Sequence, residues 1–400
     1  MEVAQVQSVQ DSVLELQLNQ ENQNQSQLTS YLGAAQQAQT QFNDTSGSGL
    51  QSVISKFFGA VQQLSTNPSD SPTRQSVLLA AQNLAQGFNS ISQSLSGQQS
   101  ALNNSITDSV SQVNVLTKQI AGLNVQIQQL QGGGQNSGAV VDQRTQAIRQ
   151  LSSLIGVSVT DAGHGAVSVS TANGAALVIA GEPESLTTQV SPSDGQQHIY
   201  DLGQDLTASI QGGSIGGSLQ ARDQTIPGLL QNLDQLAAGI ENAVNSQNKA
   251  GTDLNGKPGG NIFTPPPAAV AGAAAQMSVA ITDPSLLAAS SDGSTGSNGN
   301  ITAMAALATQ GIVNGQTPAD AYTNMVSTLG GQISNATSEQ TASNLNLQQL
   351  QSQRASISGV NMDEEASNLI QFERAYQGAA RVAQVVDQMM QVALTIGGPA

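Results

Sequence analysis

The chain has 400 residues, and its 11 Lys plus Arg against 27 Asp plus Glu give a formal net charge of −16. Such an acidic chain repels phosphate backbones and anionic lipid surfaces, which argues against nucleic acid as a partner. The absence of Cys excludes a disulfide framework and thiolate metal sites. With only 2% aromatic residues there is little material for a tight ligand pocket. The composition favours an extended structural protein over an enzyme.

Hydropathy along the chain predicts no membrane span. A spanning helix needs about 18 or more consecutive apolar residues, and the nearest stretch, 268–281, consists of small residues interrupted by Gln276. The start, Met1 to Gln5, lacks the basic region and apolar core of a cleavable signal peptide. If the protein is exported, another route must carry it.

The N-terminal part is predicted to be helical. Apolar residues recur at steps of three and four over 5–42 and again over 50–64, which is the pattern of one helix face. A third helix is expected to start with Ser71 as its N-cap and Pro72 at its first position. Its apolar stripe continues to Leu130, so an unbroken helix would span about 80 Å at 1.5 Å per residue.

Glycines argue against the continuity of this helix and then mark its end. Gly97 and Gly122 argue against a straight, continuous helix, because glycine disfavours helix interiors. The run 132–134 ends it. A returning helix of about fifteen residues is predicted over 140–154, with Gly156 as its C-cap.

From Val157 the apolar period changes from 3.6 to 2, which is typical of strands. Gly and Asp cluster between the alternating runs, so a small antiparallel β domain is predicted within the helical chain. The alternating residues include a final strand at 206–210; they are Val157, Val159, Val167, Val169, Leu177, Ile179, Leu186, Thr188, Val190, Leu206, Ala208 and Ile210.

After the β domain the helical period returns. A helix starting at Pro227 is predicted over 226–249, and heptad spacing resumes beyond residue 301. The predicted fold class is mainly α with an inserted β domain (α+β), an elongated discontinuous helical bundle or coiled coil plus a small antiparallel β domain. The predicted parts are 1–156 (N-terminal bundle), 157–222 (β domain), 223–250 (helix returning to the bundle), 251–300 (Gly/Pro/Ser-rich excursion, a candidate for completing the β domain), 301–359 (C-terminal bundle) and 360–400 (C-terminal helix).

The C-terminal helix carries one long apolar stripe. Asn361 is a candidate N-cap, and the acidic residues that follow it favour the positive end of the helix dipole. Steps of three and four, sustained over this length, form the seam of a coiled coil. Two interpretations are open: the stripe docks on the chain's own core, or it meets helices of neighbouring molecules. The stripe comprises Leu369, Phe372, Tyr376, Ala379, Ala383, Val386, Met390 and Ala393.

One segment matches a catalytic motif. Gly212 to Gly216 has the form G-x-S-x-G, the nucleophile elbow of hydrolases, with Ser214 as the nucleophile. That motif requires an acid and a His downstream, whereas His164 and His198 both precede it. A Gly-rich turn between strand and helix explains the match better.

Metal and cofactor motifs are equally weak. The two His residues lie thirty-four positions apart without Cys or H-E-x-x-H, which argues against zinc. Residues 253–256 lack the oxygen ladder and closing Glu of a calcium loop, so a turn is expected there. No phosphate-binding loop is found. The sequence therefore predicts no catalytic set, no metal and no cofactor.

The start of the C-terminal helix resembles a family signature. It is similar to the signature that bacterial flagellar axial proteins share, namely the rod, hook and hook-associated proteins, and most similar to the hook-associated type that joins hook to filament. Segments further upstream, including Leu233–Asp234 and Asn245, agree with the family pattern, while Asn248 stands where the family has His. The signature residues are Asp363, Glu364, Glu365, Asn368, Arg374, Tyr376 and Gln377.

The resemblance implies a non-enzymatic structural subunit of the flagellum, which acts in assembly and motility. It would form the hook–filament junction by helix packing in a tube, with the C-terminal helix in the axial core. The implied partners are further copies in a ring, the hook protein, hook-associated protein 3 and an export chaperone. The implied location is extracellular, reached without a cleavable signal peptide. The alternatives are a hook-like or filament-like subunit and, from another class, a secreted serine hydrolase using Ser214.

The family also has a further N-terminal segment, whose helix pairs with the C-terminal helix. The present sequence starts without it, so a truncated or misassigned start is expected, or else impaired assembly. In the isolated chain, residues 360–396 would then lack one partner helix.

Overall fold

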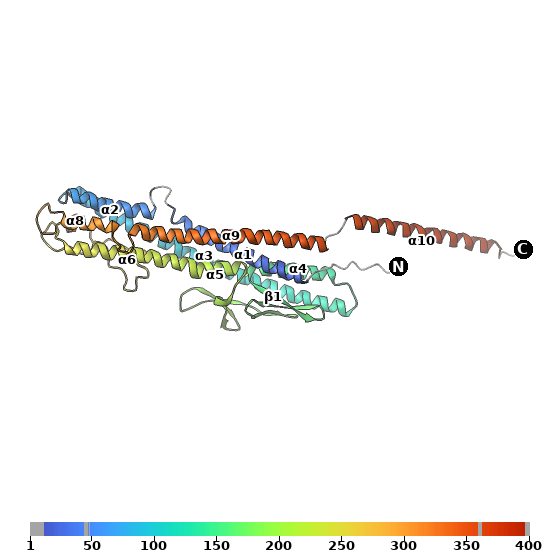
Figure 1. The fold of residues 1–400 in the computed structure, drawn as a ribbon. Helices are drawn as coiled ribbons and strands as arrows, with labels where there is room; N and C mark the ends of the chain where they lie inside the picture. Colours follow the sequence, from blue (N-terminus) through green and yellow to red (C-terminus); the bar gives the residue numbers. More distant parts are fainter. Residues whose placement is uncertain (1–11, 44–46, 48, 359–361, 397–400) are drawn as a thin grey trace. The chain divides into compact units, whose positions relative to one another are not determined.

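The computed structural model describes residues 12–43, 47, 49–358 and 362–396 (Figure 1). It divides into two compact units. One unit is Leu16–Leu347, and the other combines Met1–Glu15 with Gln348–Ala400. The first unit contains both hydrophobic cores, and the second contains the C-terminal helix.

Helices dominate the described chain, as predicted. Short 3-10 turns at Thr207–Ser209, Pro284–Leu286 and Leu307–Thr309 join some of them, and a π-helical segment, Ala221–Thr225, connects α5 to α6 without a break. The α-helices are α1 (Ser12–Thr40), α2 (Leu50–Thr66), α3 (Ser71–Gly132), α4 (Gly138–Leu154), α5 (Gly213–Gln220), α6 (Ile226–Ala250), α7 (Ala273–Gln276), α8 (Gly299–Ala306), α9 (Pro318–Ser358) and α10 (Met362–Ile396).

The helix α3 runs unbroken for 62 residues, about 93 Å at 1.5 Å per residue. It continues through Gly97 and Gly122, because both glycines lie on its exposed side while apolar residues on the other side are buried. Its N-cap is Asp70 and not Ser71 as predicted, since the Asp70 carboxylate accepts the Thr73 N–H at 2.9 Å.

The first half of α3 belongs to one hydrophobic core. Its residues Val77 to Leu95 pack with α1, α2, α6, α8 and the first part of α9. Aromatic rings pack together in this core, where Phe57 lies between Phe58 and Phe263, with ring centroids 5.1 and 5.7 Å away. The discontinuous bundle predicted from the shared period is thus present within this unit.

The second half of α3 belongs to a separate core. Ile106 to Ile127 pack with α4, with both small sheets and with Ile215 and Leu219 of α5. The next buried residue, Ala221, already belongs to the first core. One helix therefore supplies both cores, and the chain passes from the second core back to the first between residues 219 and 221.

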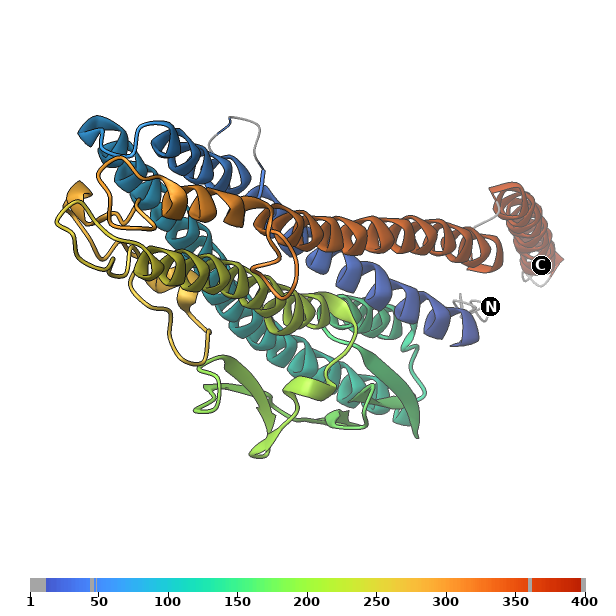
Figure 2. The ribbon, with the colours of Figure 1, turned by 60° about the vertical axis from the view of Figure 1, so that its left-hand side comes forward.

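Two small antiparallel sheets form the β part, on the same side of α3 (Figure 2). Their orders are β1-β2-β3-β4 and β5-β6-β7. In the first pairing Val159 lies opposite Val169, which places the alternating valines as the period-two pattern predicted. The strands are β1 (Val157–Gly163), β2 (Ala166–Thr171), β3 (Ala176–Ile179), β4 (Glu182–Pro183), β5 (Thr187–Val190), β6 (Gln197–Asp201) and β7 (Gln204–Asp205).

Two boundaries of the β part differ from the prediction. Residues 206–210 are not a strand, because the Asp205 carboxylate accepts the Thr207 N–H at 2.9 Å and turns the chain into a 3-10 helix. The predicted helix over 226–249 is present as α6 (Ile226–Ala250), and an unpredicted helix, α5, precedes it from Gly213 despite the low helix propensity of its glycines. Gly156 is not the C-cap of α4; Ile155 is.

Asparagines on α3 hold the sheets. Asn114 donates to Leu186 O at 2.8 Å and accepts the Leu186 N–H at 2.9 Å. Asn124 makes the same two-way contact with Val167, at 2.7 and 3.2 Å, and donates to Ala180 O. Asn103 accepts the Gln197 N–H at 3.2 Å. These amides satisfy backbone groups that would otherwise be buried without partners.

We predict that Asn114→Ala destabilises the β part by about 2 kcal/mol, because it leaves both the N–H and the carbonyl of Leu186 unpaired. Chemical denaturation measures the loss, and amide hydrogen exchange should localise it to β5. Asn104→Ala is the matched control, since Asn104 is exposed on the same helix. Equal effects of the two substitutions would contradict this role of Asn114.

The excursion after α6 does not complete the β domain. Its apolar residues Ile262, Phe263 and Met277 lie in the first core, and its pairings are isolated bridges and no continuous ladder. Polar side chains of α6 fix its backbone. Asn245 accepts the N–H groups of Ile262 and Phe263, and Asn248 donates to Gly260 O and accepts the Ala288 N–H. The excursion is therefore a part of the helical bundle.

Glu241 is a buried acid in this core. It is 1% exposed, and its Oε2 has no hydrogen-bond partner. Burial, with a smaller contribution from the Asp234 carboxylate, raises its pKa from the ordinary 4.5 to about 8. Because the folded chain holds this proton more tightly than the unfolded chain, folding stability falls as pH rises from about 4.5 to about 8.

We predict that Glu241→Gln removes this pH dependence and raises stability at pH 8 by a few kcal/mol, since each tenfold change in proton affinity corresponds to about 1.4 kcal/mol. Urea denaturation at pH 5, 6.5 and 8 measures the effect. Glu182→Gln, an exposed site in β4, is the control and should leave the slope unchanged. A parallel slope in wild type and Glu241→Gln would contradict the burial of an uncharged Glu241.

Candidate functional site

The C-terminal helix α10 carries the predicted seam on an exposed surface. Leu369, Phe372 and Tyr376 are 68%, 70% and 73% exposed, and Val386 and Met390 are also exposed. Ala379 and Ala383 continue the line between them. The helical period thus places the seven described seam residues on one face, as the spacing predicted, and Ala393 lies on the helix although its side chain is outside the described set.

The signature residues lie at the start of the same helix. Arg374, Tyr376 and Gln377 are exposed, and the Gln377 amide donates to the Glu373 carboxylate at 3.3 Å. Of the others, the structure describes the backbone of Asp363, Glu364, Glu365 and Asn368 as helical and not their side chains. The candidate cap Asn361 is outside the described residues.

Ser214 does not meet the requirements of a nucleophile elbow. It lies in the first turn of α5, half-buried, and none of the hydrogen bonds in the described part of the chain joins it to a histidine. His164 occupies an exposed turn between β1 and β2. The His198 ring instead contacts the carboxylates of Asp205 and Asp194 at 2.6 and 3.0 Å.

These carboxylates shift the pKa of His198. Partial burial favours the neutral ring, but the hydrogen bonds to Asp205 and Asp194 outweigh it and raise the pKa of His198. The arrangement pins strand β6 to the neighbouring turn and to β7. It stabilises a hairpin and leaves no imidazole to activate a serine.

The glycines around Ser214 have packing roles. Gly212 and Gly213 adopt positive φ angles of 73° and 64°, which form the turn into α5. A Cβ on Gly217 would lie 2.2 Å from the Gln27 carbonyl oxygen of α1, so only glycine permits this close helix contact. The run that mimics the hydrolase motif therefore serves a turn and a helix–helix approach.

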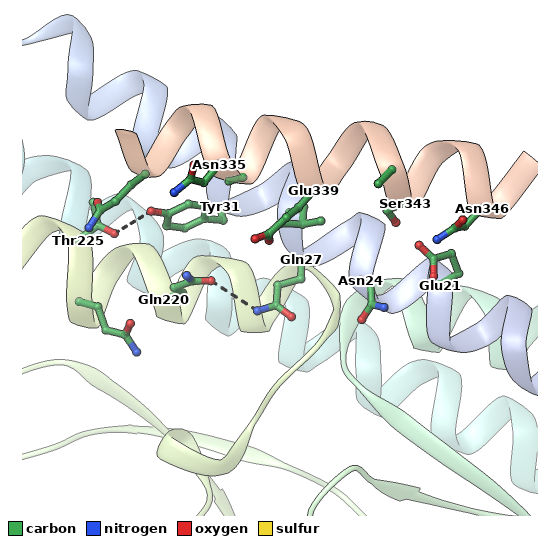
Figure 3. Close-up of a pocket in the computed structure, with 15 residues that line it drawn as sticks. Glu21, Asn24, Gln27, Tyr31, Gln220, Thr225, Asn335, Glu339, Ser343 and Asn346 are labelled. Carbon is green, nitrogen blue, oxygen red and sulfur yellow. Dashed lines mark hydrogen bonds between the residues drawn. The ribbon is translucent and has the colours of Figure 1, made fainter. Parts of the chain in front are cut away.

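A polar groove lies between α1, the α5–π-helix segment and α9 (Figure 3). Its volume is about 710 Å³, and Glu21, Glu339 and Gln27 all lie along it. The hydrogen bonds inside it are long, 3.5 Å from Gln27 to Gln220 and 3.4 Å from Thr225 to Tyr31. No His, Cys, Lys or Arg lines it. Such a surface suits water or another polar surface better than a reaction.

The sequence contained a signal for this groove that was missed. Glu21, Asn24 and Gln27 follow one another at steps of three on α1, and polar residues at steps of three and four continue on α9. A polar stripe at helical period indicates a surface that stays wet inside a bundle.

Within the described residues, no group of three or more His, Cys, Asp and Glu side chains is placed to hold a metal ion. The Asp253 carboxylate accepts the N–H groups of Asn255 and Lys257, which makes residues 253–257 the predicted turn. None of the described helices has an apolar stretch long enough for a membrane crossing.

The segment that contains α10 matches a family of known proteins. Residues 351–396, which include all of α10, match the family "Flagellar basal body rod FlgEFG protein C-terminal". The exposed seam thus lies in a segment shared by the rod and hook proteins of the bacterial flagellum. The chain is a structural protein of the flagellar axial class, which associates with other axial proteins.

The helical bundle matches a narrower family within the flagellar axial class. Residues 35–263 match the family "Flagellar hook-associated protein FlgK helical domain". The chain belongs to this FlgK family of flagellar hook-associated proteins. The predicted membership in the hook-associated branch of the flagellar axial proteins is confirmed.

Individual relatives agree over most of the chain. Flagellar hook-associated protein 1 of Bacillus subtilis is 29% identical over 96% of this chain and 83% of the relative. The protein of the same name from Escherichia coli is 28% identical over 88% of this chain and 82% of the relative. The structure of the flagellar hook junction protein FlgK from Burkholderia pseudomallei, 20% identical, has the same fold with a TM-score of 0.77, over 85% of this chain and 99% of that chain.

Proposed function

We propose that this chain forms part of the junction between hook and filament, where it packs by helix–helix contacts in a tubular assembly. The carrying observation is the exposed apolar seam of α10 within a segment that matches flagellar axial proteins. Large apolar side chains lined up at coiled-coil spacing are unfavourable when exposed to water, and a partner helix that covers them removes this unfavourable exposure.

The seam is sufficient to drive such a contact. Covering a Leu, Phe, Val or Met side chain contributes about 1.5–3 kcal/mol. Leu369, Phe372, Val386 and Met390 together would supply on the order of 8 kcal/mol before the entropy lost on association. That magnitude suits a helix that docks only when other subunits are present.

The partners and the location follow as parts of the same proposal. The chain assembles with further copies of itself in a ring, with the hook protein below and hook-associated protein 3 above, after delivery by a flagellar export chaperone. It works outside the cell. The bundle segments 1–156, 223–250 and 301–359 pack in the wall, with the β domain 157–222 facing outward and 360–400 in the axial core.

The test replaces two seam residues. Phe372→Ser with Met390→Ser should lower incorporation at the hook tip by about tenfold or more, because it removes about 4 kcal/mol of burial. Incorporation is scored by immunolabelling and motility in cells that lack their own copy. Gln384→Ser with Gln388→Ser, both exposed on the polar face, is the control. Circular dichroism should show equal helix content in all variants, and normal incorporation of the seam variant would contradict the proposal.

The absence of catalysis is a further part of the proposal. Ser214→Ala should change neither stability nor incorporation, because Ser214 has no histidine partner and its neighbours Gly212, Gly213 and Gly217 carry the structural roles. Hydrolysis of a panel of activated esters by the purified chain should be absent before and after the substitution. Activity that Ser214→Ala abolishes while incorporation persists would favour the hydrolase alternative.

A further inference from the structure

The polar groove carries two acidic side chains and no basic one. Glu21 of α1 and Glu339 of α9 both line it, and no Lys, Arg or His does. None of the ion pairs in the described part of the chain involves either carboxylate. Opposite charges within about 4 Å attract each other even near a protein surface. The groove therefore favours a cationic occupant.

The two carboxylates lie at different points along the groove. Helices α1 and α9 are antiparallel, and the Gln340 amide donates to the Thr29 hydroxyl at 2.8 Å, which fixes their register. In this register Glu21 and Glu339 are about nine residues, or about 13 Å, apart along the helix axes. Figure 3 shows both side chains, with Ser343 between them. A metal ion holds its oxygen ligands within about 2.6 Å, so the spacing favours a longer cation with two charges.

A buried hydroxyl without a hydrogen-bond partner faces the groove between them. Ser343 is 5% exposed, and its Oγ atom makes no hydrogen bond in the described chain. The hydroxyls of Ser338 and Ser352 on the same helix donate to backbone carbonyls one turn earlier, at 3.0 and 2.9 Å. The Ser343 oxygen instead points from α9 toward α1 (Figure 3). Buried hydroxyls in folded proteins are normally paired, so this atom favours a ligand that brings an N–H group to it.

Apolar surface connects these polar points. The side chains of Leu28, Ala336 and Ala342 line the same groove. Methylene groups can lie along apolar surface while the charged nitrogens at their ends stay in polar surroundings, as they do in lysine side chains. The side-chain amides of Asn24 and Asn346 add oxygen acceptors. The groove thus combines the features that a flexible aliphatic amine requires.

We propose that this groove binds a linear aliphatic triamine of the spermidine type. Its terminal ammonium groups pair with the Glu21 and Glu339 carboxylates, and its middle N–H group donates to Ser343 Oγ. Such a chain has nine bonds between its terminal nitrogens and spans about 11 Å when extended. That length matches the spacing of the two glutamates, because each side chain can lean toward the ligand. The inference concerns a ligand of the bundle and is independent of the proposed role at the hook–filament junction.

Isothermal titration calorimetry of the purified full chain tests the length and the middle nitrogen of the ligand. Spermidine should bind. The amine 1,8-diaminooctane has the same length with a methylene in place of the middle nitrogen, and it should bind more weakly because it lacks one charge and one donor. The amine 1,4-diaminobutane spans only about 6 Å and reaches one carboxylate, so its affinity should be lower than that of spermidine by about tenfold or more. Mg²⁺ is the control for charge alone.

Two double variants test the carboxylates. Glu21→Gln with Glu339→Gln keeps the shape of both side chains and removes both charges, so it should lower the affinity for spermidine by about tenfold or more. Asp108→Asn with Glu182→Gln removes the same number of charges at exposed positions outside the groove, and it should change the affinity by less than about twofold. Circular dichroism should show the same helix content in both variants and in wild type.

Ser343→Ala tests the contact with the middle nitrogen. It should lower the affinity for spermidine by about fivefold, because one hydrogen bond from a charged group is lost. The affinity for 1,8-diaminooctane should stay unchanged. Ser338→Ala is the matched control, since Ser338 is exposed on the same helix and its hydroxyl donates to the backbone. Equal losses for the two amines would overturn the contact at Ser343.

The triamine site as a whole is overturned by any of three results. One is an absence of spermidine binding up to millimolar concentration, and another is an equal loss of affinity in the groove variant and in its control. The third is binding of Mg²⁺ as tight as that of spermidine, which would show that charge alone determines the affinity. These measurements use the purified chain, so their failure leaves the role of the α10 seam in incorporation unaffected.

Discussion

The continuity of α3 is the constraint on which the rest of the structure depends. Its first half packs in one core and its second half packs in another. A single helix therefore fixes how the sheets are rotated about its axis relative to the bundle. A helix turns by about 100° per residue. Inserting or deleting one residue between Leu95 and Ile106 would therefore rotate the second core relative to the first. The helix must stay continuous between the two cores, and it does so through its glycines.

Amide side chains attach the irregular parts to this frame. Asn114 and Asn124 fix strand backbone to α3, while Asn245 and Asn248 fix the 251–300 excursion to α6. Each amide both donates and accepts hydrogen bonds, which matches a peptide group without adding charge. The sequence is rich in Asn and looks like low complexity, yet several of these asparagines make specific hydrogen bonds to the backbone. The substitution of Asn248 for the family's His fits this role.

Much of the fold could be predicted from periodicity. The 3.6-residue stripes located the long helices, because the apolar faces of α2, α3 and α10 repeat over many turns, and the period of two located β1 and β2. The errors fall where tertiary contacts override local preference. The glycine-rich run 213–217 belongs to helix α5, where α1 approaches Gly217 too closely for any larger residue, and Phe263 enters the bundle core although its surroundings carry loop residues.

The functional surface was predictable for a different reason. The spacing of residues along one helix alone determines a seam such as Leu369 to Met390, because these side chains share one face whether or not a partner is present. The polar groove along Glu21 and Glu339 was not predicted, because it requires α1 and α9 to meet across about three hundred residues of sequence.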